Sequence, residues 1–431
     1  MKRPGSHKIK AGALQFTLFI GVLILLILTA FVLLSYTHQR FRGQNNLLKE
    51  TIQTADNAIQ YALQSDLTFT DQPTTLKAPF FKEYEEVKLT AKPWGLYTQL
   101  KSIASAKNYS FERNALIGGK VPEESRNALV LANTFSPLVL VGTSKIVGDS
   151  RLSEYGVKPG SMGSAYFTGN TLIAGRVQVD NREALPQLPN SFINQLKRLS
   201  KRLPEGSETV LNYKGKPFHN SFKEETQWIL DSRELILTDT ITGNIIIHSD
   251  TKIRVETGAY LKDVILTAPE VVLQSGTKGN FQVFATKSIE LKSQVNLQYP
   301  SALVLTTESK RQLKYTTEAD LETTNSIKIG SGSILKGSVV YLGDQPNLNY
   351  EPEVFIDRDT YLYGELYCEQ NVELKGNVFG SIFTRAFVSR EFGSVYRNHL
   401  YNGVIDITQL TPKFAGLPIE STSKTVTKWV Y

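Results

Sequence analysis

The longest uncharged stretch of the chain constrains its fold most. Residues 11–35, AGALQFTLFIGVLILLILTAFVLLS, contain no charged side chain. A helix of this length, at about 1.5 Å per residue, crosses a hydrocarbon core of about 30 Å and satisfies its own backbone in lipid. A cleaved signal peptide is the competing interpretation, but its apolar run is normally about 7–15 residues long. We therefore predict an uncleaved single-pass transmembrane helix over 11–35 that contacts membrane lipid.

The basic residues that give the chain its charge of +7 cluster around this segment. The first 49 residues hold Lys2, Arg3, Lys8, Lys10, Arg40, Arg42 and Lys49 and no acidic residue, which leaves 41 basic and 41 acidic residues in the remainder. A nucleic-acid binder needs a cationic face on its folded part, so we predict no nucleic-acid partner. The positive-inside rule favours a basic cytoplasmic leader over residues 1–10. The ectodomain would then lie on the periplasmic or other extracytoplasmic side of the cell inner membrane.

The helix is predicted to continue beyond the membrane as an amphipathic stalk over residues 36–66. One apolar stripe runs along it, and from Leu48 onward its members follow steps of four and three residues, the spacing of a coiled-coil seam. The stripe consists of Phe41, Leu48, Ile52, Ala55, Ile59 and Ala62. Only about two heptads are visible, so two alternatives remain open. The stalk packs on its own ectodomain, or it pairs with another anchored helix.

A short basic leader, Gly12, a long apolar helix and an amphipathic continuation resemble the N-terminus of type IV pilins and accessory pseudopilins. The resemblance covers about fifty residues and includes GAL at 12–14, followed by an Ile/Leu run. It implies cleavage by a leader peptidase after Gly12, a helix packed in a filament core and a globular part outside. The sequence departs from the family at Thr17, the fifth residue after the glycine, where most members carry glutamate. This departure leaves the processing open.

Residues 67–135 are predicted as a mixed α/β linker segment. EEVKLTAK at residues 85–92 alternates like a strand. WGLYTQLKSIASAK, which follows, places Leu96, Leu100 and Ile103 at helix spacing. We therefore expect one strand and one helix in this part of the segment.

Pairs of apolar residues recur at a nearly constant spacing later in the chain. Ile253/Val255, Val271/Leu273 and Ile289/Leu291 are 18 residues apart, as are Val354/Ile356 and Val372/Leu374. A second series, Val264/Leu266, Phe281/Val283 and Leu303/Leu305, is spaced by 17 and 22. Residues at i and i+2 of a strand point to the same side, and repeats of this kind are typical of a β-helix in which each turn of chain stacks on the one before.

The predicted fold class is thus mainly β: a single N-terminal transmembrane and stalk α-helix, a β-rich segment and a parallel β-helix, or solenoid. The β-helix would occupy residues 136–410, with its earlier rungs at 138–181. A helical insertion is expected near 189–203, a polar loop near 306–326 and a C-terminal tail or strand over 411–431. A sandwich or an irregular antiparallel sheet of short strands is the alternative.

The repeat also resembles the β-helical domain of bactofilin-type, polymer-forming proteins. SIKIGSGSILKGSVV and NVELKGNVFGSIF carry the resemblance, which extends over about half of the chain. It implies a structural, self-associating protein. The rungs are less regular than in that family, and the N-terminal and inserted portions are not bactofilin-like.

Few residues suggest catalysis. A glycosidase needs two carboxyl groups at a fixed separation. Asp357 and Asp359 in FIDRDTYLYG are the best local pair, because residues spaced i, i+2 on a strand share a face. The favoured interpretation is that they are acids at a strand end, at a corner of the coil. The five histidines show no metal-ligand spacing; they are His7, His38, His219, His248 and His399. The single cysteine, Cys368, excludes an intramolecular disulfide and is interpreted as a small buried hydrophobe.

These observations predict no catalytic, cofactor-binding or metal-binding residues and no cofactor. We expect a non-enzymatic, membrane-anchored structural or scaffold protein of the cell envelope that presents a β-helical ectodomain. A pilin-like or secretion assembly component is the specific version, with protein partners or self-association. The alternative is a membrane-tethered β-helix protein that acts on or binds polysaccharide. A cluster of tyrosines could serve binding, although core packing and stacked outward ladders are the favoured interpretation: Tyr341, Tyr350, Tyr361, Tyr363 and Tyr367.

Overall fold

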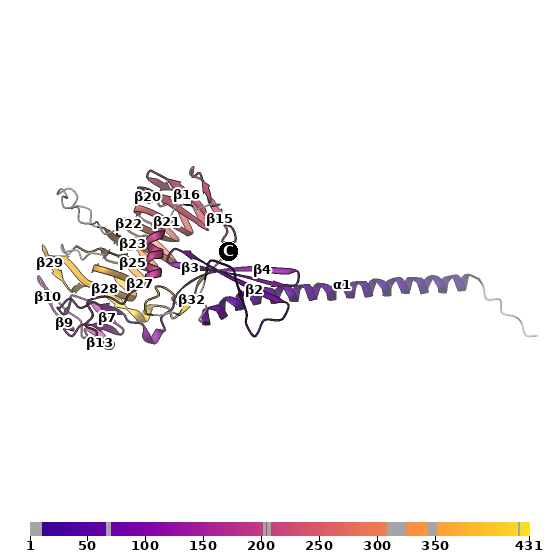
Figure 1. Cartoon of the computed structure of the whole chain (residues 1–431), viewed down its shortest axis with the longest axis horizontal. Helices are drawn as coiled ribbons and strands as arrows, with labels where there is room; N and C mark the ends of the chain where they lie inside the picture. The colour runs from indigo at the N-terminus through magenta and orange to yellow at the C-terminus, as the bar shows by residue number, and fades with distance from the viewer. Residues whose placement is uncertain are drawn as a thin grey trace, which may run out of the picture.

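The computed structural model describes residues 11–65, 70–200, 204, 208–307, 325–343, 351–420 and 423–431. The chain is mainly β with one long N-terminal apolar helix, α1 (Ala11–Gln64), which projects from the β-rich body (Figure 1). This much of the predicted fold class is confirmed. The predicted polar loop near 306–326 lies largely outside the described residues.

A five-stranded antiparallel sheet carries the C-terminal end of α1. Its order is β1-β2-β3-β4-β32. The strands are β1 (Thr74–Leu76), β2 (Glu85–Trp94), β3 (Tyr97–Ala106), β4 (Tyr109–Gly119) and β32 (Lys424–Val430). The helix expected around Leu96–Ile103 is wrong, because this stretch is β3. Alternate residues of β3, including Leu100, Ser102 and Ala104, are buried. This is the two-residue period of a strand, and the helix-like spacing of Leu96, Leu100 and Ile103 was misleading.

The remaining body is inserted between two neighbouring strands of this sheet. β4 pairs with β32 in antiparallel register, with Gly119 opposite Lys424, although some 300 residues separate them in the chain. The C-terminal region that was predicted as a tail or strand therefore includes β32, an edge strand of this sheet. Because both ends of the insertion leave from adjacent strands, helix and sheet form one module and the inserted body forms another.

Most strands of the inserted body pair in parallel. In chain order from residue 209 they are β14 (Thr209–Leu211), β15 (Phe218–Asn220), β16 (Gln227–Asp231), β17 (Leu235–Leu237), β18 (Thr240–Gly243), β19 (Ile245–Ser249), β20 (Lys252–Val255), β21 (Tyr260–Leu273), β22 (Lys278–Leu291), β23 (Asn296–Thr306), β24 (Ser326–Ile329), β25 (Ile334–Leu342), β26 (Val354–Ile356), β27 (Tyr361–Leu374), β28 (Asn377–Glu391) and β31 (Val404–Asp406). Ile253 pairs with Val271, and Val271 with Ile289, as the 18-residue spacing predicts. Parallel pairing of this kind excludes the antiparallel sandwich for these strands.

The strands at residues 129–179 do not precede this series in space. β5 (Leu129–Leu131) pairs with β28, and β7 (Lys145–Val147) pairs with β31. β8 (Ser150–Leu152) lies beside β5, and β12 (Ile173–Ala174) and β13 (Val177–Val179) pair with β7 and β8. The expectation that residues 138–181 are earlier rungs is therefore wrong in order, because β7, β8, β12 and β13 follow β28 and β31 in the pairings. In the series of paired strands, β13 lies at one end and β14 at the other.

Shorter elements complete the described chain. A three-stranded sheet contains β30 (His399–Tyr401), β6 (Leu138–Val141) and β9 (Val157–Pro159), and β10 (Ser161–Met162) pairs with β11 (Ala165–Tyr166). β29 (Ser394–Arg397) forms a hairpin with the end of β28. Helix α2 (Asn190–Leu199) falls where a helical insertion was expected, and short 3₁₀ turns cover Glu123–Ser125 and Ile407–Gln409.

A glycine ladder marks one bend that repeats on successive strands. Gly337, Gly364 and Gly380 pair with one another in register and have φ of 146°, 150° and 155°. A Cβ atom on Gly364 would lie 1.8 Å from the carbonyl oxygen of Gly337, and one on Gly380 would lie 1.8 Å from that of Gly364. Only glycine fits such stacked bends, because the conformation and the close approach both exclude a side chain.

Two apolar cores hold the body together. The first lies on the inward side of the parallel strands, where Ile253, Val271 and Ile289 are fully buried. The second lies on the outward side of the same strands, where Ile265 and Phe284 are covered by α2 and the β2–β3 turn. The outward side of these strands is therefore partly buried, and this buried part attaches the inserted body to the rest of the chain.

Candidate functional site

The first candidate site is the apolar surface of α1. Among the described residues it is the one helix long and apolar enough to cross a membrane, and none of its apolar window is buried. The large side chains from Leu14 to Leu34 face outward along its whole circumference. A helix that is apolar on all sides needs lipid or other apolar helices around it. This surface is thus consistent with membrane anchoring or secretion.

A polar part of the same helix, residues 36–46, separates the apolar surface from the β-rich body. All of these residues are exposed. Eleven helical residues extend for about 16 Å. If residues 11–35 lie in a membrane, this segment, hereafter the neck, keeps the body clear of the lipid.

The C-terminal end of α1 packs on the antiparallel sheet. Ala55, Ala58, Ile59 and Ala62 are fully buried against β2, β3 and β4. Arg113 of β4 contacts Asp56 at 2.8 Å, which adds an ion pair at the edge of this contact. Of the two alternatives for the apolar stripe, packing on its own ectodomain is thus confirmed from Ala55 onward.

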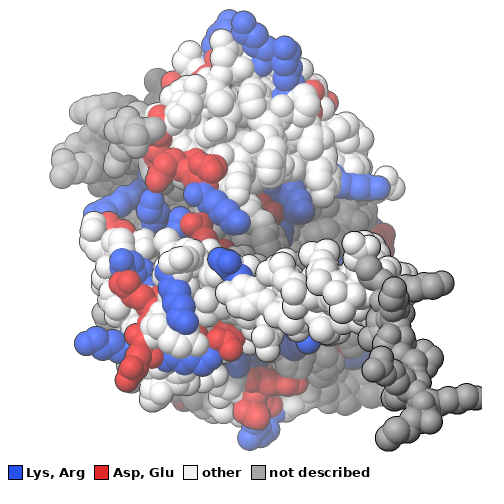
Figure 2. Space-filling view, turned by 90° about the vertical axis from the view of Figure 1, so that its right-hand side faces the viewer, with Lys and Arg blue, Asp and Glu red and all other residues white. Residues whose placement is uncertain are grey.

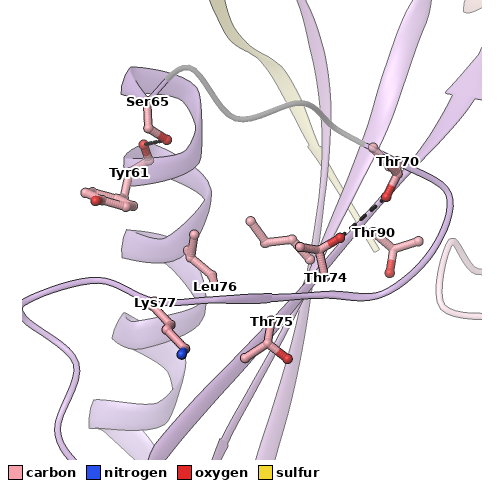
Figure 3. Close-up of a pocket in the computed structure, with 10 residues that line it drawn as sticks. Tyr61, Ser65, Thr70, Thr74, Thr75, Leu76, Lys77 and Thr90 are labelled. Carbon is pink, nitrogen blue, oxygen red and sulfur yellow. Dashed lines mark hydrogen bonds between the residues drawn. The ribbon is translucent and has the colours of Figure 1, made fainter.

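A pocket of about 300 Å³ lies where α1 ends against β1 and β2 (Figure 3). Tyr61 comes from the helix, Ser65 directly follows it, and Thr74, Leu76 and Thr90 come from the strands. Among the described residues, hydroxyl groups and apolar side chains line the pocket, and Lys77 is the one charged group. No acid, histidine or thiol occurs in this described lining.

Two polar side chains in one column attach the inserted body to the sheet module. Gln282 and Glu365 both belong to the outward column that runs through Ala302 and Ser338. Gln282 Oε1 accepts a hydrogen bond from Leu96 N at 2.7 Å, and its Nε2 donates to Trp94 O at 3.2 Å. Glu365 Oε2 accepts from Leu417 N at 2.8 Å. Both side chains therefore bind backbone groups of segments that lead into the antiparallel sheet.

The buried carboxyl group of Glu365 is the most perturbed acid at this contact. Burial raises its pKa to about 7, against the smaller opposing effects of the Leu417 N–H and the nearby Arg126 guanidinium. Arg126 itself donates to the carbonyl oxygens of Thr411, Pro412 and Phe414. A cavity of about 470 Å³ adjoins both side chains. Since the arginine is committed to the backbone, the cluster is interpreted as a structural contact.

The two aspartates considered for catalysis lie in a turn. Asp357 and Asp359 lie in the turn after β26 rather than on a strand, which corrects the expectation that they share a strand face. Asp357 Oδ1 accepts from Arg358 N at 2.7 Å, and Asp359 has a positive φ of 58°. Acids at turns of this kind stabilise the turn itself.

One histidine does lie between an acid and a hydroxyl group. His248 Nδ1 is 2.8 Å from Thr267 Oγ1, and its Nε2 is 3.2 Å from Asp250 Oδ1. This arrangement resembles a nucleophilic triad, but Thr267 is fully buried and a substrate has no access to its hydroxyl. His219 and His399 make separate contacts, His38 is exposed on the neck, and His7 lies outside the described residues.

Cys368 is buried, as expected, and burial raises the pKa of its thiol well above the usual value. Such a thiol is a poor nucleophile at neutral pH. In the part of the chain that the structure describes, no three His, Cys, Asp or Glu residues lie together as metal ligands would.

Figure 2 shows the molecule from the side on which α1 projects, and positive and negative side chains are interspersed on this face. This face therefore has no continuous cationic surface. The described chain also has exposed ion pairs, such as Lys82 with Glu50 at 2.8 Å and Lys88 with Glu86 at 3.2 Å. Exposed pairs of this kind contribute little to stability.

Comparison with known proteins gives little further guidance. No protein-family model matches the chain, and no curated protein matches it. The bactofilin-like resemblance therefore has no support from these comparisons. A solved structure that the chain resembles is the competence-associated pilin ComZ from Thermus thermophilus, with 10% identity over 89% of this chain and 96% of that chain. The TM-score is 0.25, too low to carry an argument about function.

Proposed function

We propose that this protein is a single-pass inner-membrane protein that serves as a structural component of a cell-envelope assembly. In this proposal, residues 11–35 of α1 lie in lipid, the neck spans the headgroup region and the β-rich body is extracytoplasmic. The more specific version is a pilin-like or secretion assembly component, in which α1 packs beside the helices of other subunits.

The observation that carries the proposal is the division of α1. Its apolar half is fully exposed, whereas Ala55, Ala58, Ile59 and Ala62 are buried in the antiparallel sheet. Burial of these four side chains fixes the direction of the helix relative to the sheet. A rigidly attached helix with an unpartnered apolar half suits a protein that is held at a membrane or in an assembly of helices, and not one that diffuses in water.

We further propose that the parallel strands are successive turns of a β-helix. Offsets of 18 residues between Ile253, Val271 and Ile289 support this, as does the glycine ladder at a repeated bend. A solenoid of this kind would be a stiff body whose two ends, near β13 and β14, leave strand edges for docking of partners or further copies. All three residues of β13 are exposed.

We also propose that the protein is not an enzyme. The candidate acids lie in a turn, the His248 contact ends on a buried hydroxyl, and the one thiol is buried. These contacts suggest that the reactive side chains stabilise the fold instead of acting on a substrate.

Alkaline extraction of membranes tests the anchoring. The wild-type chain is expected to stay in the membrane pellet. A variant with Leu23→Arg and Ile27→Arg places two charges at the centre of the apolar segment, at a cost of about 2.5–3.5 kcal/mol each, and should shift to the soluble or aggregated fraction. Gln39→Arg with Gln44→Arg in the neck is the matched control and should remain in the pellet. A wild-type chain extracted by alkali as fully as a soluble protein would contradict the proposal.

A further inference from the structure

A groove crosses the outward face of the inserted body where β23, β25 and β27 lie side by side. Its volume is about 430 Å³. Asn296 and Gln298 of β23, Lys336 of β25 and Tyr363 of β27 form its floor, and the segment from Gln409 to Phe414 forms one wall. This groove lies away from α1, and its wall adjoins the contact at Glu365, because Arg126 donates to the carbonyl oxygens of Thr411 and Phe414.

An aromatic row continues from the floor of the groove. Tyr361 and Tyr363 project outward from β27, and Phe379 projects outward from β28, because the intervening Leu362 and Val378 are fully buried in the inner core. The ring centroids of Tyr363 and Phe379 are 5.0 Å apart, and those of Tyr361 and Phe379 are 5.9 Å apart. Tyr361 is 37% exposed. The predicted tyrosine cluster thus divides: Tyr341 and Tyr367 are buried, Tyr361 and Tyr363 face outward, and Tyr350 lies outside the described residues.

The spacing of the row matches one class of ligand. Neighbouring parallel strands lie about 4.8 Å apart, which is close to the length of one sugar ring in an extended glycan. Aromatic side chains on adjacent rungs can therefore contact successive rings. Each ring contributes an apolar surface with a negative face, which suits the C–H groups of a pyranose.

The polar groups of the groove suit the same ligand. Gln298 Nε2 donates to Asn296 Oδ1 at 2.6 Å, so the two amides form one unit, and Gln409 supplies a third amide on the wall. An amide offers both donors and acceptors, which is what sugar hydroxyl groups require. Lys336 Nζ lies 5.9 Å from the centroid of the Tyr363 ring. None of the described residues that line the groove is acidic, and the one charged group among them is a cation beside the aromatic row.

We propose that this groove, with the row of Tyr363, Tyr361 and Phe379, binds an acidic glycan strand. The sugar rings lie along the aromatic row, the amides bind hydroxyl groups, and Lys336 pairs with a carboxylate of the glycan. A nucleic acid fits less well, because a phosphate backbone requires several cations along its path and the described lining of the groove supplies one.

Binding of defined oligosaccharides to the full chain in detergent micelles tests the inference. The probes are hexamannuronate, which is acidic, and cellohexaose, its neutral counterpart, titrated by isothermal calorimetry. The wild-type chain should bind hexamannuronate more tightly than cellohexaose. Tyr363→Ala should weaken binding of hexamannuronate by about tenfold or more, equivalent to about 1.4 kcal/mol. Lys336→Gln should reduce the affinity for hexamannuronate to that for cellohexaose.

Controls separate the site from the fold. Tyr166→Ala removes an exposed tyrosine elsewhere on the body and should leave both affinities unchanged. Lys336→Gln keeps the aromatic row, so its selective effect remains informative if Tyr363→Ala misfolds. The inference is overturned if the wild-type chain binds neither oligosaccharide, if it binds both equally, or if Tyr166→Ala weakens binding as much as Tyr363→Ala. Capture of a protein at this face without glycan binding would likewise overturn it.

Discussion

Substitution of Gly364 by alanine tests the stacked bends most sharply. At φ of 150° this residue occupies a region that is essentially restricted to glycine, and a side chain there costs about 1–3 kcal/mol. The added Cβ would also lie 1.8 Å from the carbonyl oxygen of Gly337, so the strands must move apart. Together these effects should reduce the free energy of unfolding by at least about 3 kcal/mol, which is a large part of the stability of a typical domain.

Urea unfolding of the detergent-solubilised chain, followed by tryptophan fluorescence, measures this loss. Two alanine variants divide the effect into its parts. Gly393 has φ of 74° and open space around its Cβ position, so Gly393→Ala reports backbone strain alone, about 1 kcal/mol. Gly258 has open space and no positive φ, so Gly258→Ala should change stability by less than about 1 kcal/mol. If Gly364→Ala destabilises the chain no more than Gly393→Ala, the stacked-bend argument is wrong.

Two further predictions concern the contact between the inserted body and the sheet module. The folded-state pKa of Glu365, about 7, exceeds its ordinary value of 4.5, so the folded chain binds more protons than the unfolded chain between these pH values. Stability therefore falls as pH rises through this window, by on the order of 3 kcal/mol. Glu365→Gln keeps an acceptor for Leu417 N–H and should abolish this dependence. Urea unfolding at pH 5 and pH 7.5 measures it, and an equal change of unfolding free energy with pH in wild type and variant would refute the assignment. Gln282→Leu leaves the buried Leu96 N–H without its acceptor and should destabilise the chain by about 1–3 kcal/mol, whereas an exposed Gln39→Leu should have no effect on unfolding of the body.

The sequence predicted the features that depend on local pattern. Residues 11–35 are helical because nothing in them interrupts an apolar helix, and the 18-residue spacing gave the pairing of Ile253, Val271 and Ile289 correctly. In the second series of apolar pairs, β-bulges changed the pairing that the spacing predicted. Leu303 pairs with Val283 and not with Phe281, because a register shift after Gly279 adds residues to β23.

Features that depend on distant residues could not be derived. The pairing of β4 with β32 joins segments some 300 residues apart, and no local pattern marks them as partners. The place of β5 beside β28 is equally non-local: its apolar pattern identified a strand but not the neighbour. No local pattern identified Gln282 or Glu365 either, because their role depends on the backbone groups that they bind between the inserted body and the sheet module.

Accessibility of the β-rich body to a protease in spheroplasts tests the central claim most directly. If residues 11–35 cross the inner membrane with the leader in the cytoplasm, external protease should digest the body and leave a short membrane-bound fragment that includes the neck. Inverted membrane vesicles should protect the body from the same protease. Protection in spheroplasts together with digestion in inverted vesicles would contradict the account, and so would recovery of the intact chain from the soluble fraction.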